Sequence, residues 1–306
     1  MNNNIARKSY LPPTVVDAFK SSMLAGHSYL KSDAKLIFLC GKRPDKSLPG
    51  GRDLIYQYAN KHMNNFQFFM AESFFDIFTN HTNKDYLSLE DKLANFSDCI
   101  IIILESESTF AELGAFALSD KLVESLLVIN DNRFKKSKSF ITLGPIAKIN
   151  KKSKFKPVIH TNLKSILSVI PTLKEKLSVI ESIYNKKIEI TSYEEFINLD
   201  EKIKMLYILD LVTIFHPISL KEIIEILIYI YGVNDYEINI ELNMLEVLRL
   251  ITKLDHYYVR STDDQQLFFK FIGFNEIKNR ASIINHYHKY FKDKVIILRR
   301  KIGMEN

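Results

Sequence analysis

CIIIIL, at residues 99–104, decides the fold class of this chain. Its four consecutive isoleucines are β-branched, which predicts a strand, and no polar residue alternates with them. A strand without such alternation is typically buried on both faces, as at the centre of a parallel sheet that helices cover. The stretch therefore favours an α/β fold.

Short apolar runs and amphipathic stretches alternate on both sides of CIIIIL. The other predicted strands are KLIFLC (35–40), FQFFMA (66–71), LLVIN (126–130) and KPVIH (156–160). The predicted helices cover residues 52–64, 88–96, 110–123 and 163–184. This order predicts a mostly parallel sheet with helices on both faces. Ligands bind beyond the carboxyl ends of such strands, so we expect the chemistry in the loops after Cys40, Ala71 and Leu104.

The alternation stops around residues 186–200. Predicted helices then cover 201–215, 220–231 and 240–254, and two predicted strands, HYYVRS (256–261) and QLFFKFI (266–272), follow. Three helices and a hairpin are typical of a winged helix, with residues 239–254 as the candidate recognition helix. A helix over 275–291 and an edge strand at VIILRR (295–300) would close this part. The predicted domains are an N-terminal extension (1–33), an α/β domain (34–188) and a winged-helix-like domain (189–306).

The composition excludes several protein classes. Of 306 residues, 46% are hydrophobic and 25% charged, which excludes a disordered chain. Cys40 and Cys99, the 2 cysteines, are too few for a disulfide scaffold or a cysteine-based zinc cluster, and we expect buried thiols in a reducing cytosol. No segment reaches the ~20 apolar residues of a membrane span, and the N-terminus lacks a signal-peptide core. We therefore expect a soluble cytoplasmic protein with no membrane contact.

Positive charge gathers in two segments of the chain, whose formal net charge is +6. Residues 131–160 hold nine basic residues and one acid, and residues 270–301 hold nine basic residues and two acids. Such clusters favour a nucleic-acid partner, although solvated surface faces explain one cluster equally well. Because winged helices also bind proteins, the partner is a nucleic acid or a protein. The candidate docking residues are Lys135, Lys136, Lys138, Lys151, Lys152, Lys154, Arg299 and Arg300.

The loop ESESTFAELGAF (105–116) combines hydroxyls and carboxylates at a predicted helix start. Ser106, Ser108 and Thr109 lie beside free N-terminal amides, which suits phosphate or sugar oxygens. Glu112 lies about one turn into the helix, where the helix dipole would lower its pKa, as a nucleophile or a stabiliser of an oxocarbenium-like centre requires. The spacing from Thr109 to Glu112 fits a helix capping box equally well, which is a purely structural role.

Other motifs are absent from the sequence. GKRPDKSLPGGR (41–52) is neither a dinucleotide-binding nor a phosphate-loop motif, so Gly41, Gly50 and Gly51 fit ordinary turns as well as a binding loop. The histidines show no metal-ligand spacing, and no Ser-His-Asp arrangement can be read. We predict neither a metal site nor a bound cofactor.

LESESTFAELGAFALSDKL (104–122) resembles the active-site segment of the nucleoside 2'-deoxyribosyltransferase-like superfamily. More closely, the chain resembles the toxic effectors of retron anti-phage systems, which carry a winged-helix tail behind such a domain. The matching strings are LIFLCG (36–41), SFFDIF (73–78), SLEDKLANFSDCIIII (88–103) and FKKSKSFITLGPI (134–146). The resemblance implies a flavodoxin-like domain that cleaves an N-glycosidic bond between a base and a sugar.

The resemblance also implies roles for single residues. Glu112 matches the carboxylate that attacks the anomeric carbon. The family's second acid usually lies six residues earlier, where this chain has Ser106, and the neighbouring Glu105 or Glu107 would replace it. This departure favours hydrolysis over sugar transfer. The remaining residues assigned to substrate binding are Gly41, Arg52, Glu72, Asp76, Ser108 and Thr109, with Arg52 as a phosphate ligand.

The implied function is that of a toxin enzyme, an N-glycosidase that destroys NAD or a related nucleotide. Its implied partners are a retron reverse transcriptase and multicopy single-stranded DNA, or an RNA–DNA hybrid, which hold it inactive. A homo-oligomer or a higher-order assembly is left open. The alternative is a DNA-binding regulator that senses a nucleotide through an inactive α/β domain.

Overall fold

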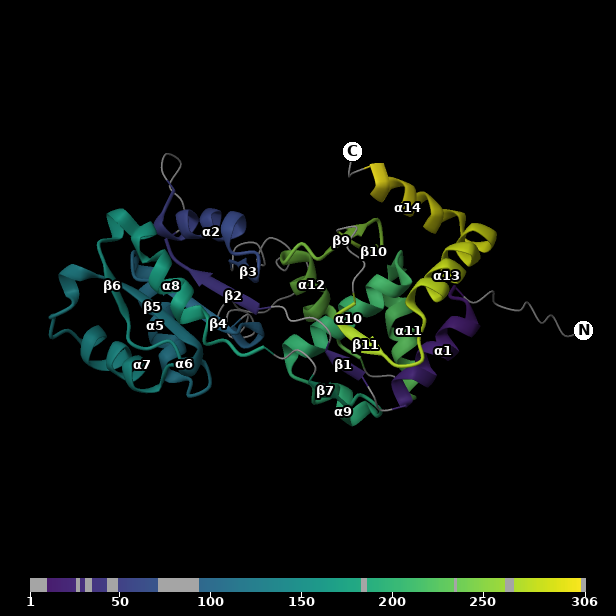
Figure 1. The fold of residues 1–306 in the computed structure, drawn as a ribbon, viewed down its shortest axis with the longest axis horizontal. Helices are drawn as coiled ribbons and strands as arrows, with labels where there is room; N and C mark the ends of the chain where they lie inside the picture. Colours follow the sequence, from purple (N-terminus) through teal and green to yellow (C-terminus); the bar gives the residue numbers. More distant parts are fainter. Residues whose placement is uncertain are drawn as a thin grey trace, which may run out of the picture. The chain divides into compact units, whose positions relative to one another are not determined.

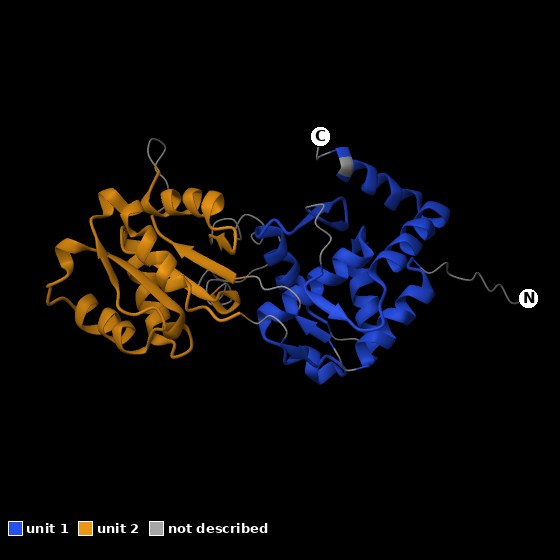
Figure 2. Cartoon of the chain, in the orientation of Figure 1, with its two compact units in different colours: residues 1–33, 183–306 blue, residues 34–182 orange. Residues whose placement is uncertain are grey.

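The computed structural model describes residues 10–25, 28–30, 35–42, 49–70, 94–182, 186–233, 236–261 and 267–303. Two compact units make up the chain. The unit called the first unit in the text is Ala34–Ser182, which Figure 2 draws in orange with the label unit 2, and the second unit is drawn in blue with the label unit 1. The other unit combines Met1–Asp33 with Ile183–Asn306. The first unit is therefore inserted, in sequence, between two parts of the second.

A five-stranded parallel sheet forms the centre of the first unit (Figure 1), as the alternating pattern predicts. Its strand order is β3-β2-β4-β5-β6. The strands are β2 (Lys35–Cys40), β3 (Phe66–Phe69), β4 (Cys99–Ile103), β5 (Leu126–Asp131) and β6 (Ile159–Thr161). Because β3 and β4 lie on opposite sides of β2, the order of strands reverses there, and such a point is the usual ligand site of an open sheet.

Strand β4 is buried along its whole length, as CIIIIL predicts. Ile101 and Ile103 pack with helix α2 (Gly51–His62) and helix α8 (Ile170–Leu177) on one face of the sheet. On the other face, the Phe38 ring lies 6.5 Å from the Phe116 ring of helix α5 (Glu107–Leu118). Helices therefore cover both faces of the sheet. The thiols of Cys40 and Cys99 are buried and not joined in a disulfide, as expected, and burial raises the pKa of Cys99.

The remaining helices of the first unit differ from the prediction in their bounds. The segment expected as one helix over 163–184 is split at Ser165, whose backbone is not helical. Of the segment 88–96, only residues 94–96 are described, and these are helical. The helical elements are α5 (Glu107–Leu118), α6 (Leu122–Ser125), η1 (Asn132–Phe134), η2 (Thr142–Ile146), α7 (Ala147–Lys152) and η3 (Leu163–Val169).

The second unit joins helices with two small antiparallel sheets, of strand order β11-β1-β7 and β8-β10-β9. Its strands are β1 (Ser28–Leu30), β7 (Lys187–Ile188), β8 (Ile218–Ser219), β9 (Ile251–Leu254), β10 (Tyr257–Arg260) and β11 (Phe269–Phe271). Its helices are α1 (Pro13–Leu24), α9 (Tyr193–Ile197), α10 (Glu201–Phe215), α11 (Leu220–Tyr231), α12 (Asn239–Val247), α13 (Glu276–Tyr290) and α14 (Lys292–Gly303). In the described part of the chain, no helix combines the length and the apolar character needed to cross a membrane.

Two expectations for this unit are wrong. The helix predicted over 240–254 ends at Val247, because Arg249 adopts a positive φ of 55° and the Leu250 N–H returns to the Leu245 carbonyl at 2.9 Å. This is the Schellman ending of a helix, so the β-branched residues that follow are free to form β9. The segment predicted as an edge strand over 295–300 belongs to helix α14.

The two strands predicted to form a hairpin, at 256–261 and 266–272, do not pair with each other. Strand β10 pairs with β9 across a turn at Asp255, which has a φ of 55°, and not with the strand that follows it. Strand β11 instead pairs with β1, from the N-terminal part of the chain. Two neighbouring β-rich runs resemble a hairpin in the sequence. The residue with the turn conformation, Asp255, lies before the first of these runs, so the turn joins β9 to β10.

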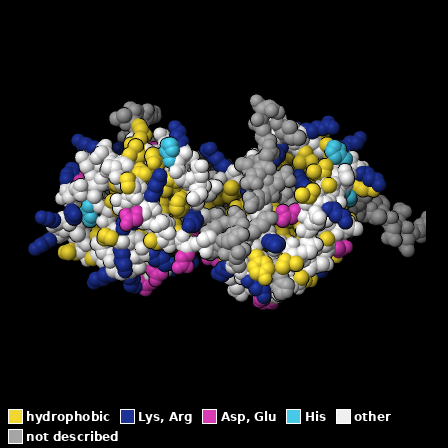
Figure 3. All heavy atoms as spheres, in the orientation of Figure 1, with side chains coloured by type: hydrophobic (Ala, Val, Ile, Leu, Met, Phe, Trp, Pro, Cys, Tyr) yellow, Lys and Arg dark blue, Asp and Glu magenta, His cyan; other side chains and the backbone are white. Residues whose placement is uncertain are grey.

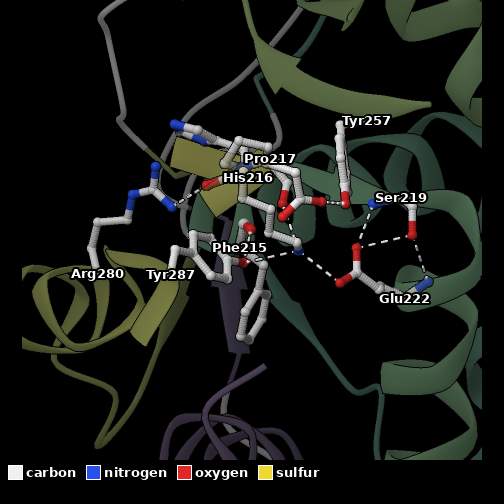
Figure 4. A network of polar contacts seen from close by, with 10 residues as sticks. Phe215, His216, Pro217, Ser219, Glu222, Tyr257, Arg280 and Tyr287 are labelled. Atoms are coloured by element: carbon white, nitrogen blue, oxygen red, sulfur yellow. Dashed lines mark hydrogen bonds and ion pairs between the residues drawn. The ribbon is translucent and has the colours of Figure 1, made fainter. Parts of the chain in front are cut away.

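A buried ion pair connects the C-terminal helices to the rest of the second unit, within the network of polar contacts that Figure 4 shows. Lys294 lies 2.6 Å from the Glu222 carboxylate, and their side chains are 0% and 4% exposed. Lys294 also donates to the Pro217 carbonyl at 2.9 Å, and the second oxygen of Glu222 accepts from the Ser219 N–H at 2.8 Å. Tyr287 donates to the Phe215 carbonyl at 2.7 Å. The network thereby joins α13 and α14 to the segment between α10 and α11.

We expect Lys294→Met to destabilise the second unit by about 3–5 kcal/mol, because it leaves the Glu222 carboxylate buried without its cation. The measurement is urea unfolding followed by the near-UV signal of tyrosine. Tyr56, Tyr58 and Tyr86 are the only tyrosines between residues 34 and 182, so this signal reports mostly on the second unit.

The exposed Lys292→Met, in the same helix, is the matched control. The double variant Lys294→Met/Glu222→Gln should lose less stability than the single variant, since no unpaired charge remains buried. Equal stability of Lys294→Met and the control would contradict this role.

Candidate active site

A pocket of about 910 Å³ opens at the carboxyl ends of β4, β5 and β6. It is lined by residues 104–107, Phe110, residues 131–134 and residues 162–164. The loop after Leu104 was predicted to carry chemistry, and it does line the pocket. The loops after β5 and β6 were not predicted from the sequence to carry chemistry. Ligands bind beyond the carboxyl ends of parallel strands in general, so the same expectation applies to these two loops.

Glu105 lines this pocket and also binds the described residues on both sides of the β2–α2 loop. Its carboxylate accepts hydrogen bonds from the N–H groups of Lys42 at 2.9 Å, Gly51 at 3.1 Å and Arg52 at 3.3 Å. Gly51 and Arg52 are the first residues of α2, so the carboxylate also caps the positive end of that helix. Glu105 thus ties the end of β4 to the end of β2.

Glycines make this contact sterically possible. A Cβ at Gly41 would lie 2.5 Å from the Arg52 Cβ and 3.0 Å from Glu105 Oε1, and a Cβ at Gly51 would lie 2.9 Å from Glu105 Oε2. Both positions are therefore restricted to glycine by close approach. Gly41 lies against Arg52 and Glu105, and the described lining of the pocket does not include it.

Ser106 and Thr109 form the cap of helix α5. The Thr109 hydroxyl donates to the Ser106 carbonyl at 2.6 Å and accepts from the Ser106 N–H at 3.2 Å. Thr109 is fully buried, whereas the Ser106 and Ser108 hydroxyls lie 3.0 Å apart near the surface. The capping box suggested for Thr109 and Glu112 is therefore wrong, because the helix begins earlier, at Glu107.

Glu112 is half-buried on the second turn of α5. It shares a helix face with Ser108, four residues before it. The field of a helix terminus weakens beyond the first turn, so the dipole acts on Glu112 less than the sequence suggested. Glu112 does not belong to the described pocket lining, and Glu72 and Asp76 lie outside the described residues.

Arg52 is held inside the first unit. Its side chain is 5% exposed and lies 3.6 Å from the Asp53 carboxylate. The cations that line the pocket are instead Arg133 and Lys164. Within the described ranges, no three His, Cys, Asp or Glu side chains gather as metal ligands would.

The eight candidate docking residues are all exposed, and Lys and Arg side chains stand out over the surface of both units in Figure 3. Lys135, Lys136 and Lys138 follow η1, next to the pocket. Lys151 and Lys152 end α7, with Lys154 just beyond it, and Lys152 pairs with Asp120 at 2.8 Å. Arg299 and Arg300 lie on α14, where Arg300 pairs with Asp255 at 3.0 Å.

We expect Glu105→Gln to weaken the contact between residue 105 and the backbone of Lys42, Gly51 and Arg52. In this variant an amide NH₂ group, which is a donor, would replace one of the accepting oxygens and face a backbone N–H. The cost should be about 1–3 kcal/mol of stability in the first unit. Hydrogen exchange followed by mass spectrometry should show faster exchange at Lys42, Gly51 and Arg52. The control is Glu107→Gln, at the exposed first position of α5. Unchanged exchange in Glu105→Gln would contradict the positioning role of Glu105.

Comparison with known proteins agrees with the predicted resemblance to retron effectors. The family model described as STM3845 retron effector protein matches residues 50–253. The chain is 30% identical over 245 residues to the Retron Ec73 putative ribosyltransferase/DNA-binding protein of Escherichia coli, covering 73% of this chain and 76% of that one. It is 36% identical over 115 residues to the corresponding Retron Ec86 protein of Escherichia coli, covering 38% and 37%. The chain therefore belongs to the STM3845 retron effector family.

Proposed function

We propose that this retron effector is a toxin that cleaves the N-glycosidic bond of a nucleotide, with NAD as the first candidate. The observation that carries the proposal is a pocket at the carboxyl edge of the parallel sheet, lined by carboxylate and hydroxyl side chains of the β4–α5 loop. Both relatives are named putative ribosyltransferases, which is the same class of bond chemistry.

The strand order of the first unit supports a flavodoxin-like domain of the nucleoside deoxyribosyltransferase type. Counted within the unit, β3-β2-β4-β5-β6 is the order 2-1-3-4-5, which flavodoxin-like sheets share. The reversal at β2 places the loops after β2 and β4 together, and the Glu105 contacts join them. In the proposed function this edge of the sheet holds the sugar.

Breaking the bond between C1' and the base nitrogen leaves the electron pair on the base and positive charge on the sugar. A carboxylate beside C1' stabilises that charge or attacks it. Glu112 takes this role in the proposal, with the Ser108 hydroxyl on the same helix face to orient the sugar. Water then adds its hydroxyl to C1', which completes hydrolysis. The proton of this water goes to a departing purine or pyrimidine base, or to solvent when neutral nicotinamide leaves NAD. The three backbone hydrogen bonds of Glu105 suit a positioning group more than a second acid.

The second unit supports a docking role. Its order α10-β8-α11-α12-β9-β10, with the sheet β8-β10-β9, is consistent with a winged helix and supports that assignment. We propose that this unit and the exposed basic residues bind a reverse transcriptase with its multicopy single-stranded DNA, which keeps the toxin inactive in the cytoplasm. The relatives' names include DNA binding, which is consistent with a nucleic-acid component in this assembly.

A second candidate is a nucleotide-sensing, DNA-binding regulator without catalysis. The engagement of Glu105 by backbone N–H groups favours it, because a carboxylate used as a clamp does not supply the family's second acid. Base release separates the two candidates, since a sensor binds its nucleotide and leaves it intact.

We expect Glu112→Gln to lower base release at least about 100-fold, because it removes the charge that stabilises the sugar cation. Purified protein would be incubated with NAD, deoxynucleosides and deoxynucleotides, and released base measured by chromatography. The matched control is Glu124→Gln, an exposed acid of α6 in the same unit.

The assay is repeated with the co-expressed reverse transcriptase and its DNA, so that a need for the partner is also tested. Full base release by Glu112→Gln would contradict the assigned role. No release by wild type in either format would favour the regulator.

A further inference from the structure

The basic side chains of the pocket lie on one wall, together with the Asp131 carboxylate, and two further acidic side chains lie on another wall. Glu105 and Glu107 come from the β4–α5 wall, whereas Arg133 and Lys164 come from the loops after β5 and β6. Its volume of about 910 Å³ lies near the upper end for small-molecule sites. A ligand that fills it therefore meets carboxylates at one wall and cations at the other.

Arg133 is fixed in place and still accessible. Its backbone N–H and its guanidinium both donate to the Asp131 carboxylate, at 2.8 Å and 2.9 Å, and this side-chain bond lowers the pKa of Asp131. Asp131 is nearly buried, whereas the Arg133 side chain is 77% exposed. A guanidinium has five N–H donors, so the bond to Asp131 orients the group and leaves other donors for an anion.

Lys164 adds a second cation from a neighbouring strand end. Its backbone N–H donates to the Asn162 side chain at 3.0 Å, which fixes the start of η3, and its own side chain is exposed. On β6, burial and, as a smaller cause, the charge of Lys135 lower the pKa of His160. Two strand ends thus contribute cations to one wall of the pocket.

Both walls of the pocket also contribute an aromatic ring. Phe134 is 47% exposed, lines the pocket and lies 5.5 Å from the Arg133 guanidinium carbon. Phe110, from α5, lines the opposite wall. Exposed aromatic rings beside an arginine form a stacking surface for a nucleobase or a nicotinamide ring.

We propose that Arg133 and Lys164 form the phosphate subsite of this pocket, so that its ligand is a free nucleotide and not a nucleoside. The choice of a nucleotide rests on the proposed function, while the anion site rests on the pocket alone. The sugar then lies toward the β4–α5 wall and the phosphate toward the loops after β5 and β6. This assignment replaces Arg52, which is held inside the unit beside Asp53.

Binding is measured by calorimetry on the full chain carrying Glu112→Gln, with AMP, adenosine and inorganic pyrophosphate as probes. We expect AMP to bind at least about 10-fold more tightly than adenosine, and pyrophosphate to compete with AMP. Adding Arg133→Ala/Lys164→Ala should weaken AMP binding about 10-fold and leave adenosine binding unchanged. The control Lys151→Ala/Lys154→Ala removes the same charge from exposed positions outside the pocket and should change neither.

Equal affinity for AMP and adenosine, or AMP binding that survives Arg133→Ala/Lys164→Ala, would overturn the assignment. A short single-stranded oligonucleotide tests the other source of phosphate, and tighter binding of the oligonucleotide than of AMP at these residues would also overturn it. The outcome is independent of turnover. If AMP binds more tightly than adenosine but no base is released by wild type, the proposed chemistry is refuted and the phosphate subsite is retained. If base is released but AMP and adenosine bind equally, the subsite is refuted and the chemistry is retained.

Discussion

The carboxylate of Glu105 accepts hydrogen bonds from the N–H groups of Lys42, Gly51 and Arg52, and the site is arranged around this contact. It connects the ends of two adjacent parallel strands at the point where the strand order reverses. Because the contact needs backbone within hydrogen-bonding distance of the carboxylate, Gly41 and Gly51 have no room for a side chain. The Glu105 carboxylate thereby accounts for the position of the Lys42 backbone, for the start of α2 and for the glycines at positions 41 and 51.

The second unit uses a buried charge in a comparable way. Lys294 and Glu222 stabilise the joint between the C-terminal helices and the rest of their unit, with backbone carbonyl and N–H groups as further partners. The Glu105 carboxylate binds backbone N–H groups of a distant segment, whereas the Glu222 carboxylate binds the nearby Ser219 N–H and the distant Lys294 side chain. In each unit a hydrogen-bonded carboxylate fixes the geometry of a connection, while Arg133 and the exposed lysines lie at the surface, where ligands or partners can reach them.

Sequence reasoning succeeded where the signal is local and failed where it is not. The isoleucine run of β4 and the five parallel strands follow from short apolar patterns, and the pocket lies at the predicted edge. The partners of Glu105 are 63, 54 and 53 residues away, and no periodicity reveals them. The pairing of β1 with β11 joins segments even farther apart. Arg133 and Lys164 were missed because the loops after β5 and β6 were not considered.

The interrupted second unit has a consequence for synthesis on the ribosome. Residues 34–182 form one continuous segment, so the pocket-bearing unit has all its residues as soon as residue 182 has left the ribosome. Strand β1 must wait for β11, which ends at residue 271. At ~5–20 residues per second, this delay is on the order of ten seconds. Each new molecule thus has all the residues of its pocket before those of the other unit are complete.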